Sequence, residues 1–176
     1  ARMKLRFFPL PEDFTGTMLR PALYQPDIPQ NAGTLIRLGA CVGVPVDIIE
    51  PCGFVLSDRN FQRAGMDYLD LASMQRHVSW AVFCDVHAKR GGRLILLTTK
   101  AATSYTGFAF QPGDTLLLGR ESAGAPGDVH DRADARLIIP MQPGRRSLNV
   151  AVAGAMVLGE ALRQLTAFPA MTESVQ

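Results

Sequence analysis

Four polar side chains that could do chemistry gather behind a short apolar run near the end of the chain. Residues 137–139 (L-I-I) predict a buried strand, and the prolines and glycine after them predict a turn. Behind that turn come Arg145, Arg146, Ser147 and Asn149. Ser and Asn favour helix starts because their oxygens accept backbone N–H groups there. Ligands of α/β sheets bind at such strand ends, so the pattern predicts a binding site, with an ordinary turn and solvated arginines as the alternative.

A second glycine-rich loop lies at residues 116–126, which read L-L-L-G-R-E-S-A-G-A-P. The three leucines predict a buried strand, Gly119 stands at its exit, and Glu121 and Gly124 follow. Glycine at a strand exit lets a backbone approach a ligand closely. The strand end at residues 97–99 could supply a third wall. An apolar slot with backbone donors and acceptors would suit an adenosine, although each loop alone also fits a tight connection.

A third set of residues lies early in the chain, where Asn31, Gly33 and Arg37 form the pattern N-x-G-x-x-x-R. We expect Asn31 to cap a helix and Arg37, about two turns later, to approach the same helix face. An arginine on an apolar helix side needs an anionic partner, either a phosphate or a protein carboxylate. A structural ion pair with Glu121 or Asp27 is the alternative.

These loops need a scaffold, and the alternation of apolar runs with helical segments predicts an α/β fold. The runs are solidly apolar rather than alternating, which indicates a mostly parallel sheet with helices on both faces. The expected strands are residues 19–24, 46–49, 68–74, 93–98, 115–118 and 136–139. The expected helices are residues 31–42, 57–64, 79–90, 128–133 and 147–165. We expect a flexible N-terminal extension at residues 1–18, one domain at 19–166 and a tail at 167–176.

Composition excludes several functional classes. The chain has 176 residues, 47% of them hydrophobic and 19% charged, which is typical of a packed globular domain. The net charge of +2 does not by itself indicate nucleic-acid binding. The three cysteines lack C-x-x-C spacing, so a disulfide framework or zinc site is disfavoured and a reducing cytoplasm is expected. We expect the histidines, which show no paired spacing, to be surface residues without a metal: His77, His87 and His130. Neither a dinucleotide fingerprint nor a P-loop is present in the sequence.

The three sets of residues, in this order, resemble the three motifs of the SPOUT RNA methyltransferases. The matching segments are N-x-G-x-x-x-R at residues 31–37, L-G-R-E-S-A-G at 118–124, and I-P-M at 139–141 with R-S-L-N at 146–149. Two further segments, L-Y-x-P-x-I-P-x-N at 23–31 and R-A-G-x-D-Y at 63–68, look more narrowly like the TrmL (YibK-like) tRNA 2'-O-methyltransferases.

This resemblance implies a SPOUT-type domain with a deep trefoil knot near its C-terminal end. It implies S-adenosylmethionine as cofactor, S-adenosylhomocysteine as product, and no metal. The substrate would be the ribose 2'-hydroxyl of the wobble nucleotide, position 34, a cytidine or modified uridine of leucine tRNAs, and the enzyme would be a cytoplasmic homodimer. The residues expected at the cofactor are Leu97, Thr98, Gly119, Glu121, Gly124, Ile139, Pro140, Met141, Ser147 and Leu148.

The implied reaction is an in-line displacement in which the 2'-oxygen attacks a methyl carbon on a sulfonium. The hydroxyl must lose its proton as it attacks, so a base or a stabiliser of the forming alkoxide is needed. Arginine hardly deprotonates, so we expect Arg37 mainly to bind the adjacent phosphate and the developing oxyanion. The residues expected to orient it and the ribose are Asn31, Glu121, Ser147 and Asn149.

RNA contact would come from clustered cations rather than from net charge, and binding should weaken with salt. The cations expected to flank the site are Arg59, Arg63, Lys100, Arg120, Arg145 and Arg146.

The last helix departs from the TrmL pattern. Ala151 and Val152 stand where TrmL-type proteins often carry Ser-Asn, and Gly159 stands where they often carry tyrosine. Ala151, Ala155 and Gly159 form a stripe of small residues at helical spacing, which favours a dimer interface over simple internal packing. The departures leave the exact tRNA target open.

Two other functions remain open at the level of sequence. One is a SPOUT methyltransferase that acts on ribosomal RNA or on another tRNA position. The other is a non-catalytic RNA-binding or assembly factor with the same fold, which binding of S-adenosylmethionine would exclude.

Overall fold

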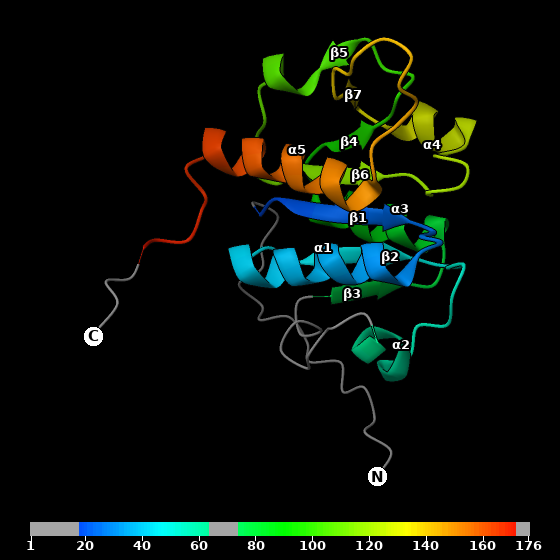
Figure 1. Ribbon diagram of the computed structural model, residues 1–176. Coiled ribbons are helices and arrows are strands. Elements are labelled where there is room, and N and C mark those ends of the chain that lie inside the picture. Colours follow the sequence, from blue (N-terminus) through cyan, green and yellow to red (C-terminus); the bar gives the residue numbers. More distant parts are fainter. Residues whose placement is uncertain (1–17, 64–73, 172–176) are drawn as a thin grey trace.

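A parallel sheet of seven strands organises the described part of the chain, residues 18–63 and 74–171 of this computed structural model (Figure 1). The strand order is β3-β2-β1-β6-β4-β7-β5. The strands are β1 (Arg20–Tyr24), β2 (Val46–Ile49), β3 (Met74–His77), β4 (Leu94–Leu97), β5 (Thr103–Ser104), β6 (Thr115–Leu118) and β7 (Ala135–Ile138). The helices are α1 (Pro29–Val42), α2 (Asp58–Arg63), α3 (Trp80–Arg90), the short 3-10 helix η2 (Tyr105–Gly107), α4 (Gly127–Arg132) and α5 (Val150–Gln164).

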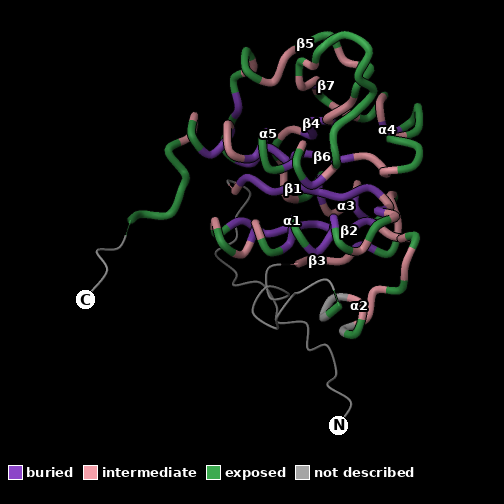
Figure 2. Tube along the Cα trace, viewed as in Figure 1, coloured by how far each residue is buried: buried purple, intermediate pink, exposed green. Residues whose placement is uncertain are grey.

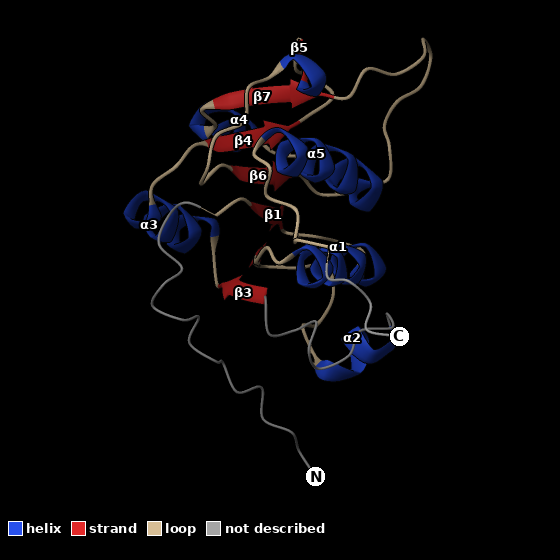
Figure 3. Cartoon of the chain, turned by 90° about the vertical axis from the view of Figure 1, so that its left-hand side faces the viewer, coloured by secondary structure: helices blue, strands red, loops and turns tan. Residues whose placement is uncertain are grey.

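Helices cover both faces of the sheet, as the apolar strands predicted. Figure 3 shows α1 and α5 on one side of the sheet and α3 and α4 on the other. All five residues of β1 are buried, and the central strands form the purple interior of Figure 2. Neighbouring residues of one strand face opposite layers: Leu118 packs with Leu35 of α1, and Leu117 packs with Phe83 of α3. The predicted α/β class is therefore confirmed.

The strand order separates strands that follow one another in sequence. β6 lies between β1 and β4, and β7 lies between β4 and β5. This order is compatible with the expected trefoil knot, but it does not trace the threading of the chain, so the knot stays a prediction.

Two helix starts differ from those predicted. α1 begins at Pro29 after Ile28, so Asn31 lies inside the first turn and is not the cap. Proline favours this position because its ring fixes a helical φ and the missing N–H would lack a partner there anyway. α5 begins at Val150, later than the predicted Ser147, because the Asn149 side chain caps it.

Most other boundaries are confirmed within two residues. Gly43 ends α1 with a left-handed φ of 74°, and Ser79 caps α3 by accepting a hydrogen bond from Val82 N at 3.1 Å. The predicted irregular segment at residues 101–111 contains the two-residue strand β5, which is too short to show a pattern. The strand expected at residues 68–74 falls mostly outside the described residues, and β3 follows it at Met74–His77.

Two histidines expected at the surface are buried. His77 and His87 are 2% and 3% exposed. His77 Nε2 lies 3.0 Å from Oδ1 of Asp47, which has no exposed surface. Arg90 also donates to Asp47, at 2.9 Å, so this buried carboxylate is balanced by polar partners that sequence spacing could not indicate.

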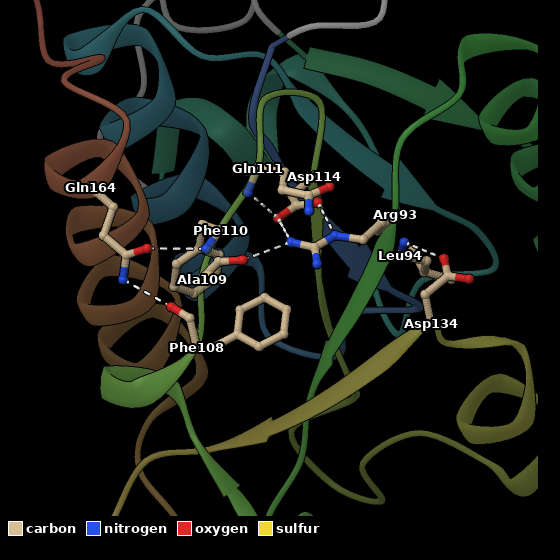
Figure 4. A network of polar contacts seen from close by, with 9 residues as sticks. All are labelled: Arg93, Leu94, Phe108, Ala109, Phe110, Gln111, Asp114, Asp134 and Gln164. Carbon is tan, nitrogen blue, oxygen red and sulfur yellow. Dashed lines mark hydrogen bonds and ion pairs between the residues drawn. The ribbon is translucent and has the colours of Figure 1, made fainter.

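A polar network closes the amino-terminal edge of the sheet (Figure 4). Arg93 donates to both carboxylate oxygens of Asp114, at 2.9 and 2.7 Å, and lies over the ring of Phe108. Gln164 of α5 accepts from Phe110 N at 3.0 Å and donates to Phe108 O at 2.9 Å. The segment before β6 is thereby tied both to β4 and to the end of α5.

We expect Arg93→Ala to lower the free energy of unfolding by about 2–3 kcal/mol, because the buried Asp114 carboxylate loses its charged partner. Urea denaturation would measure the change. Arg136→Ala is the control. That guanidinium is 46% exposed, and its contacts with Asp131 at 3.8 Å and with His130 O at 3.0 Å lie at the surface, so we expect a loss below about 1 kcal/mol. Equal losses in the two variants would contradict the role of the network.

Candidate active site

A cavity of about 580 Å³ opens where the loops after β4, β6 and β7 meet. Its size is in the range of small-molecule sites. Nine of the ten residues expected at a cofactor line it: Leu97, Thr98, Gly119, Glu121, Gly124, Ile139, Met141, Ser147 and Leu148. Pro140, the tenth, is exposed and is not among the lining residues.

The wall after β6 is a tight reversal that requires glycine. Arg120 and Gly124 exchange two backbone hydrogen bonds, of 2.9 and 2.8 Å, and Gly124 has a left-handed φ of 66°. A Cβ on Gly119 would lie 2.6 Å from Gly124 C and 2.7 Å from Ala125 N, closer than real contacts allow. The loop therefore folds back on its own strand exit and presents its backbone to the cavity.

A chain of hydrogen bonds joins the three predicted sets of residues. Asn31 Nδ2 donates to Glu121 Oε1 at 3.4 Å, and Asn149 Nδ2 donates to Asn31 Oδ1 at 3.0 Å. Asn149 Oδ1 accepts from the first amides of α5, at 2.9 Å from Ala151 N. Asn31 is 8% exposed, so these amide contacts form beside the cavity with little water to compete. Loops far apart in sequence are thus fixed to one another at the cavity.

Asp27 binds the same glycine-rich loop from the other side. Its backbone N donates to Glu121 Oε2 at 2.7 Å. Its carboxylate accepts from the Arg120 guanidinium and, at 3.1 Å, from Ser122 N. The guanidinium of Arg120 and the Ser122 hydroxyl hold the pKa of Asp27 at about 2. Arg120 was expected to bind RNA, and its charge is instead paired with Asp27.

Arg37 is not on the same face as Asn31. Asn31 is buried and lines the cavity, whereas Arg37 is exposed and is not among the lining residues. Positions six residues apart on a helix point about 120° away from each other, so the expectation of a shared face was wrong. The two carboxylates offered as its ion-pair partners have the contacts described above: Glu121 accepts from Asn31, and Asp27 accepts from Arg120.

Cations lie at the mouth of the cavity rather than in its depth. Lys100 and Arg146 are exposed and also belong to the lining. Arg145 is exposed beside them without lining the cavity, and Arg59 and Arg63 are exposed on α2, below α1 in Figure 1. The cavity thus has an interior lined by apolar side chains and backbone, and positive charge at its mouth.

Sequence reasoning missed several lining residues. Ile28 and Ala153 contribute apolar surface, and His130 contributes polar surface. His130 was assigned to the surface, but it is half-buried and contacts Thr98 at 3.0 Å. No spacing rule would have found it, because Thr98 and His130 are 32 residues apart in the sequence and meet only in the folded chain.

Residues 18–159 match the model of the SpoU rRNA methylase family. The chain belongs to this family. It is 63% identical over 146 residues to a tRNA (cytidine(34)-2'-O)-methyltransferase of Beijerinckia indica subsp. indica, and the match covers 83% of this chain and 91% of that protein. The resemblance to the TrmL type inferred from the motifs is thereby confirmed.

Solved structures agree with this assignment. One, described as giving structural insights into the 2-OH methylation of C/U34 on tRNA, has a TM-score of 0.79 and 42% identity, covering 86% of this chain and 98% of that one. Another is the SpoU methyltransferase AviRb from Streptomyces viridochromogenes in complex with the cofactor AdoMet. It has a TM-score of 0.76 and 26% identity, covering 85% of this chain and 61% of that one.

Within residues 18–63 and 74–171, no helix is long and apolar enough to cross a membrane. The same ranges contain no group of three or more His, Cys, Asp or Glu that could bind a metal ion.

We expect Gly119→Ala to lower the free energy of unfolding by about 2–3 kcal/mol, since its Cβ would meet backbone atoms that cannot move aside. Gly107→Ala is the control because a Cβ there meets nothing within 4 Å, and its effect should stay below about 1 kcal/mol. Urea titrations of both variants would measure this. If Gly119→Ala were as stable as the wild type, the tight reversal would not be required.

The Asp27 contacts predict a pH dependence. Its pKa is lowered from 3.8 to about 2, so the stability it adds is fully present above its ordinary pKa and is lost as the pH falls toward 2. The difference in unfolding free energy between wild type and Asp27→Asn should therefore be constant at neutral pH and shrink in acid. Denaturation across a pH series would test this. Asp131→Asn, at a side chain that is 85% exposed, is the control. A difference that did not shrink in acid would contradict the pairing.

Proposed function

We propose that this protein transfers a methyl group from S-adenosylmethionine to the ribose 2'-hydroxyl of nucleotide 34, a cytidine or modified uridine, of leucine tRNAs. The observation that carries the proposal is the cavity, because it unites all three motifs in a chain 63% identical to a tRNA (cytidine(34)-2'-O)-methyltransferase. Identity of 42% to the structure concerned with C/U34 methylation supports the same nucleotide.

The cavity fits the proposed cofactor. Leu97, Ile139 and Leu148 offer apolar surface for an adenine ring, and the reversal at Gly119 exposes backbone donors and acceptors for its edge. When bound, S-adenosylmethionine supplies an electrophilic methyl group on a sulfonium. The complex of AviRb with AdoMet supports the choice of cofactor.

The residues beside the cavity would orient the ribose. Asn31 is hydrogen-bonded to both Glu121 and Asn149, so the remaining donors and acceptors of these side chains have fixed directions. Ser147 is exposed at the mouth and would contact the incoming nucleotide. Because the 2'-oxygen must lose its proton as it attacks, a cation near that oxygen would stabilise the forming alkoxide.

Arg37 would supply that cation to a second copy of the chain. It is exposed on α1 and outside its own cavity, so in a homodimer it would act at the partner's cavity. α5 beside it carries exposed apolar side chains, with Val152 49% and Met156 40% exposed. Ala155 is exposed on the same helix, and Gly159 has open space around it. Ala151, the other member of the small-residue stripe, packs inside the core instead.

The tRNA would approach across the cavity mouth. Lys100 and Arg146 lie at its edge, with Arg145 next to them. These exposed cations would bind phosphates, and binding should weaken as salt rises. Arg63 on α2 would contact the substrate only beyond the mouth, and Arg120 would act through Asp27 rather than on RNA. Residues 19–166 would form the whole catalytic domain.

We expect the purified protein to transfer a labelled methyl group from S-adenosylmethionine to leucine tRNA. Nucleoside mapping should place the product on the ribose of nucleotide 34. A transcript with a 2'-deoxy nucleotide at position 34 is the matched control and should accept no label, because the nucleophile is missing. Label at another position would contradict the proposal, as would label on ribosomal RNA alone. Absence of S-adenosylmethionine binding would favour the non-catalytic alternative.

The dimer predicts complementation between two inactive variants. Arg37→Ala lacks the cation, and Asn149→Ala breaks the hydrogen bonds beside the cavity. Mixed dimers would contain one intact site, so an equal mixture exchanged through mild denaturation should recover about a quarter of wild-type activity. Activity assays of the mixture would test this. If the mixture stayed as inactive as each variant alone, Arg37 would act within its own subunit.

A further inference from the structure

His130 lies on α4, and its ring bridges two walls of the cavity. Its Nε2 is 3.0 Å from the Thr98 hydroxyl, in the loop after β4. Its Nδ1 is 3.1 Å from Pro126 O, at the end of the loop after β6. His130 and Thr98 both line the cavity and are both half-buried. The ring therefore connects the Thr98 loop to the start of α4, which directly follows the loop after β6.

The partners of the ring assign its protons. Pro126 O can only accept, so Nδ1 carries a hydrogen and, in the neutral ring, Nε2 is an acceptor. The Thr98 hydroxyl then donates to Nε2, while its oxygen accepts from Lys100 N at 3.2 Å. The hydrogen bonds therefore all run in one direction: the Lys100 amide donates to Thr98, Thr98 donates to His130, and His130 donates to the Pro126 carbonyl.

Strand pairing alone does not set the distance between these two walls. β4 and β6 are paired up to Leu97 and Leu118, and the two loops leave the sheet beyond that pair. Thr98 N donates to Leu137 O, which ties the first loop to β7 but not to the loop after β6. The ring of His130 makes the missing connection at the level of the cavity.

We propose that His130 is a positioning residue, which fixes the loop of Thr98, Thr99 and Lys100 against the glycine-rich loop and so sets the width of the cofactor cavity. This inference rests on the proposed function, because it takes S-adenosylmethionine to be the occupant. His130 acts through Thr98 and does not itself transfer a proton or bind the methyl group.

Calorimetry of S-adenosylmethionine binding to the full chain tests the proposal. His130→Leu removes the acceptor at similar volume, and we expect the Kd to rise about fivefold, the usual effect of losing one such hydrogen bond. His130→Gln can still accept from Thr98 and should stay within about twofold of the wild type. Asp131→Asn on the same helix is the matched control and should leave the Kd unchanged, since that carboxylate is 85% exposed.

A double-mutant cycle separates the bridge from a general loss of packing. Thr98→Val removes the other partner, and the Kd of Thr98→Val/His130→Leu should equal that of Thr98→Val alone, because only one interaction is lost. Steady-state kinetics should show a raised KM for S-adenosylmethionine, with kcat and the KM for tRNA unchanged. An unchanged Kd in His130→Leu, or fully additive effects, would overturn the proposal.

Hydrogen exchange of the Lys100 amide gives a readout that needs no cofactor. This amide donates to Thr98, so its exchange should accelerate in His130→Leu and in Thr98→Val but not in His130→Gln. If the wild type failed to bind S-adenosylmethionine, the proposed function would be wrong. Hydrogen exchange of the Lys100 amide would still test the contact between His130 and Thr98. If His130→Leu failed to fold, His130→Asn, which is too short to reach Thr98, would take its place. Equal exchange in wild type and bridge-breaking variants would refute the bridge.

Discussion

The carboxylate of Glu121 is the point on which the site depends. One oxygen accepts from Asp27 N at 2.7 Å and the other from Asn31 at 3.4 Å. Asn31 in turn accepts from Asn149, which caps α5. One side chain thereby connects the start of α1, the loop after β6 and the start of α5. Removing this carboxylate would leave Asp27 N and the Asn31 amide without their acceptor.

The sheet makes that connection possible by bringing strand ends from distant parts of the chain to one edge. β6 lies beside both β1 and β4, so the loops after these three strands open together. The opposite edge is closed by Arg93, Asp114 and Gln164, which tie the segment before β6 to β4 and to α5. The amino-terminal ends of the strands are therefore held by a hydrogen-bonded network, and the loops at their carboxyl-terminal ends surround a cavity.

The cationic side chains around the cavity fall into two groups, one paired with a carboxylate and one exposed to solvent. Arg120 lies against the loop after β1 and is neutralised by Asp27, whereas Lys100 and Arg146 stay exposed at the mouth. A paired guanidinium strengthens the contact between loops, and exposed cations remain available to a phosphate backbone. Residue type alone did not separate these two roles, since the sequence analysis grouped Arg120, Lys100 and Arg146 together as RNA-binding cations.

The sequence by itself determined the fold class, most element boundaries and the family, because apolar runs, glycines and ordered motifs are local properties. Nine of the ten residues that it named at the cofactor line the cavity. It placed Asn31 as a cap and Arg37 on the same face, and it assigned His77 and His130 to the surface. Only the tertiary structure decided these: the pairing of β2 with β3 brings Asp47 to His77, and α4 brings His130 to Thr98 in the loop after β4. Long-range contacts between polar side chains leave no periodic signal, since their partners are chosen by the sheet order and not by spacing along the chain.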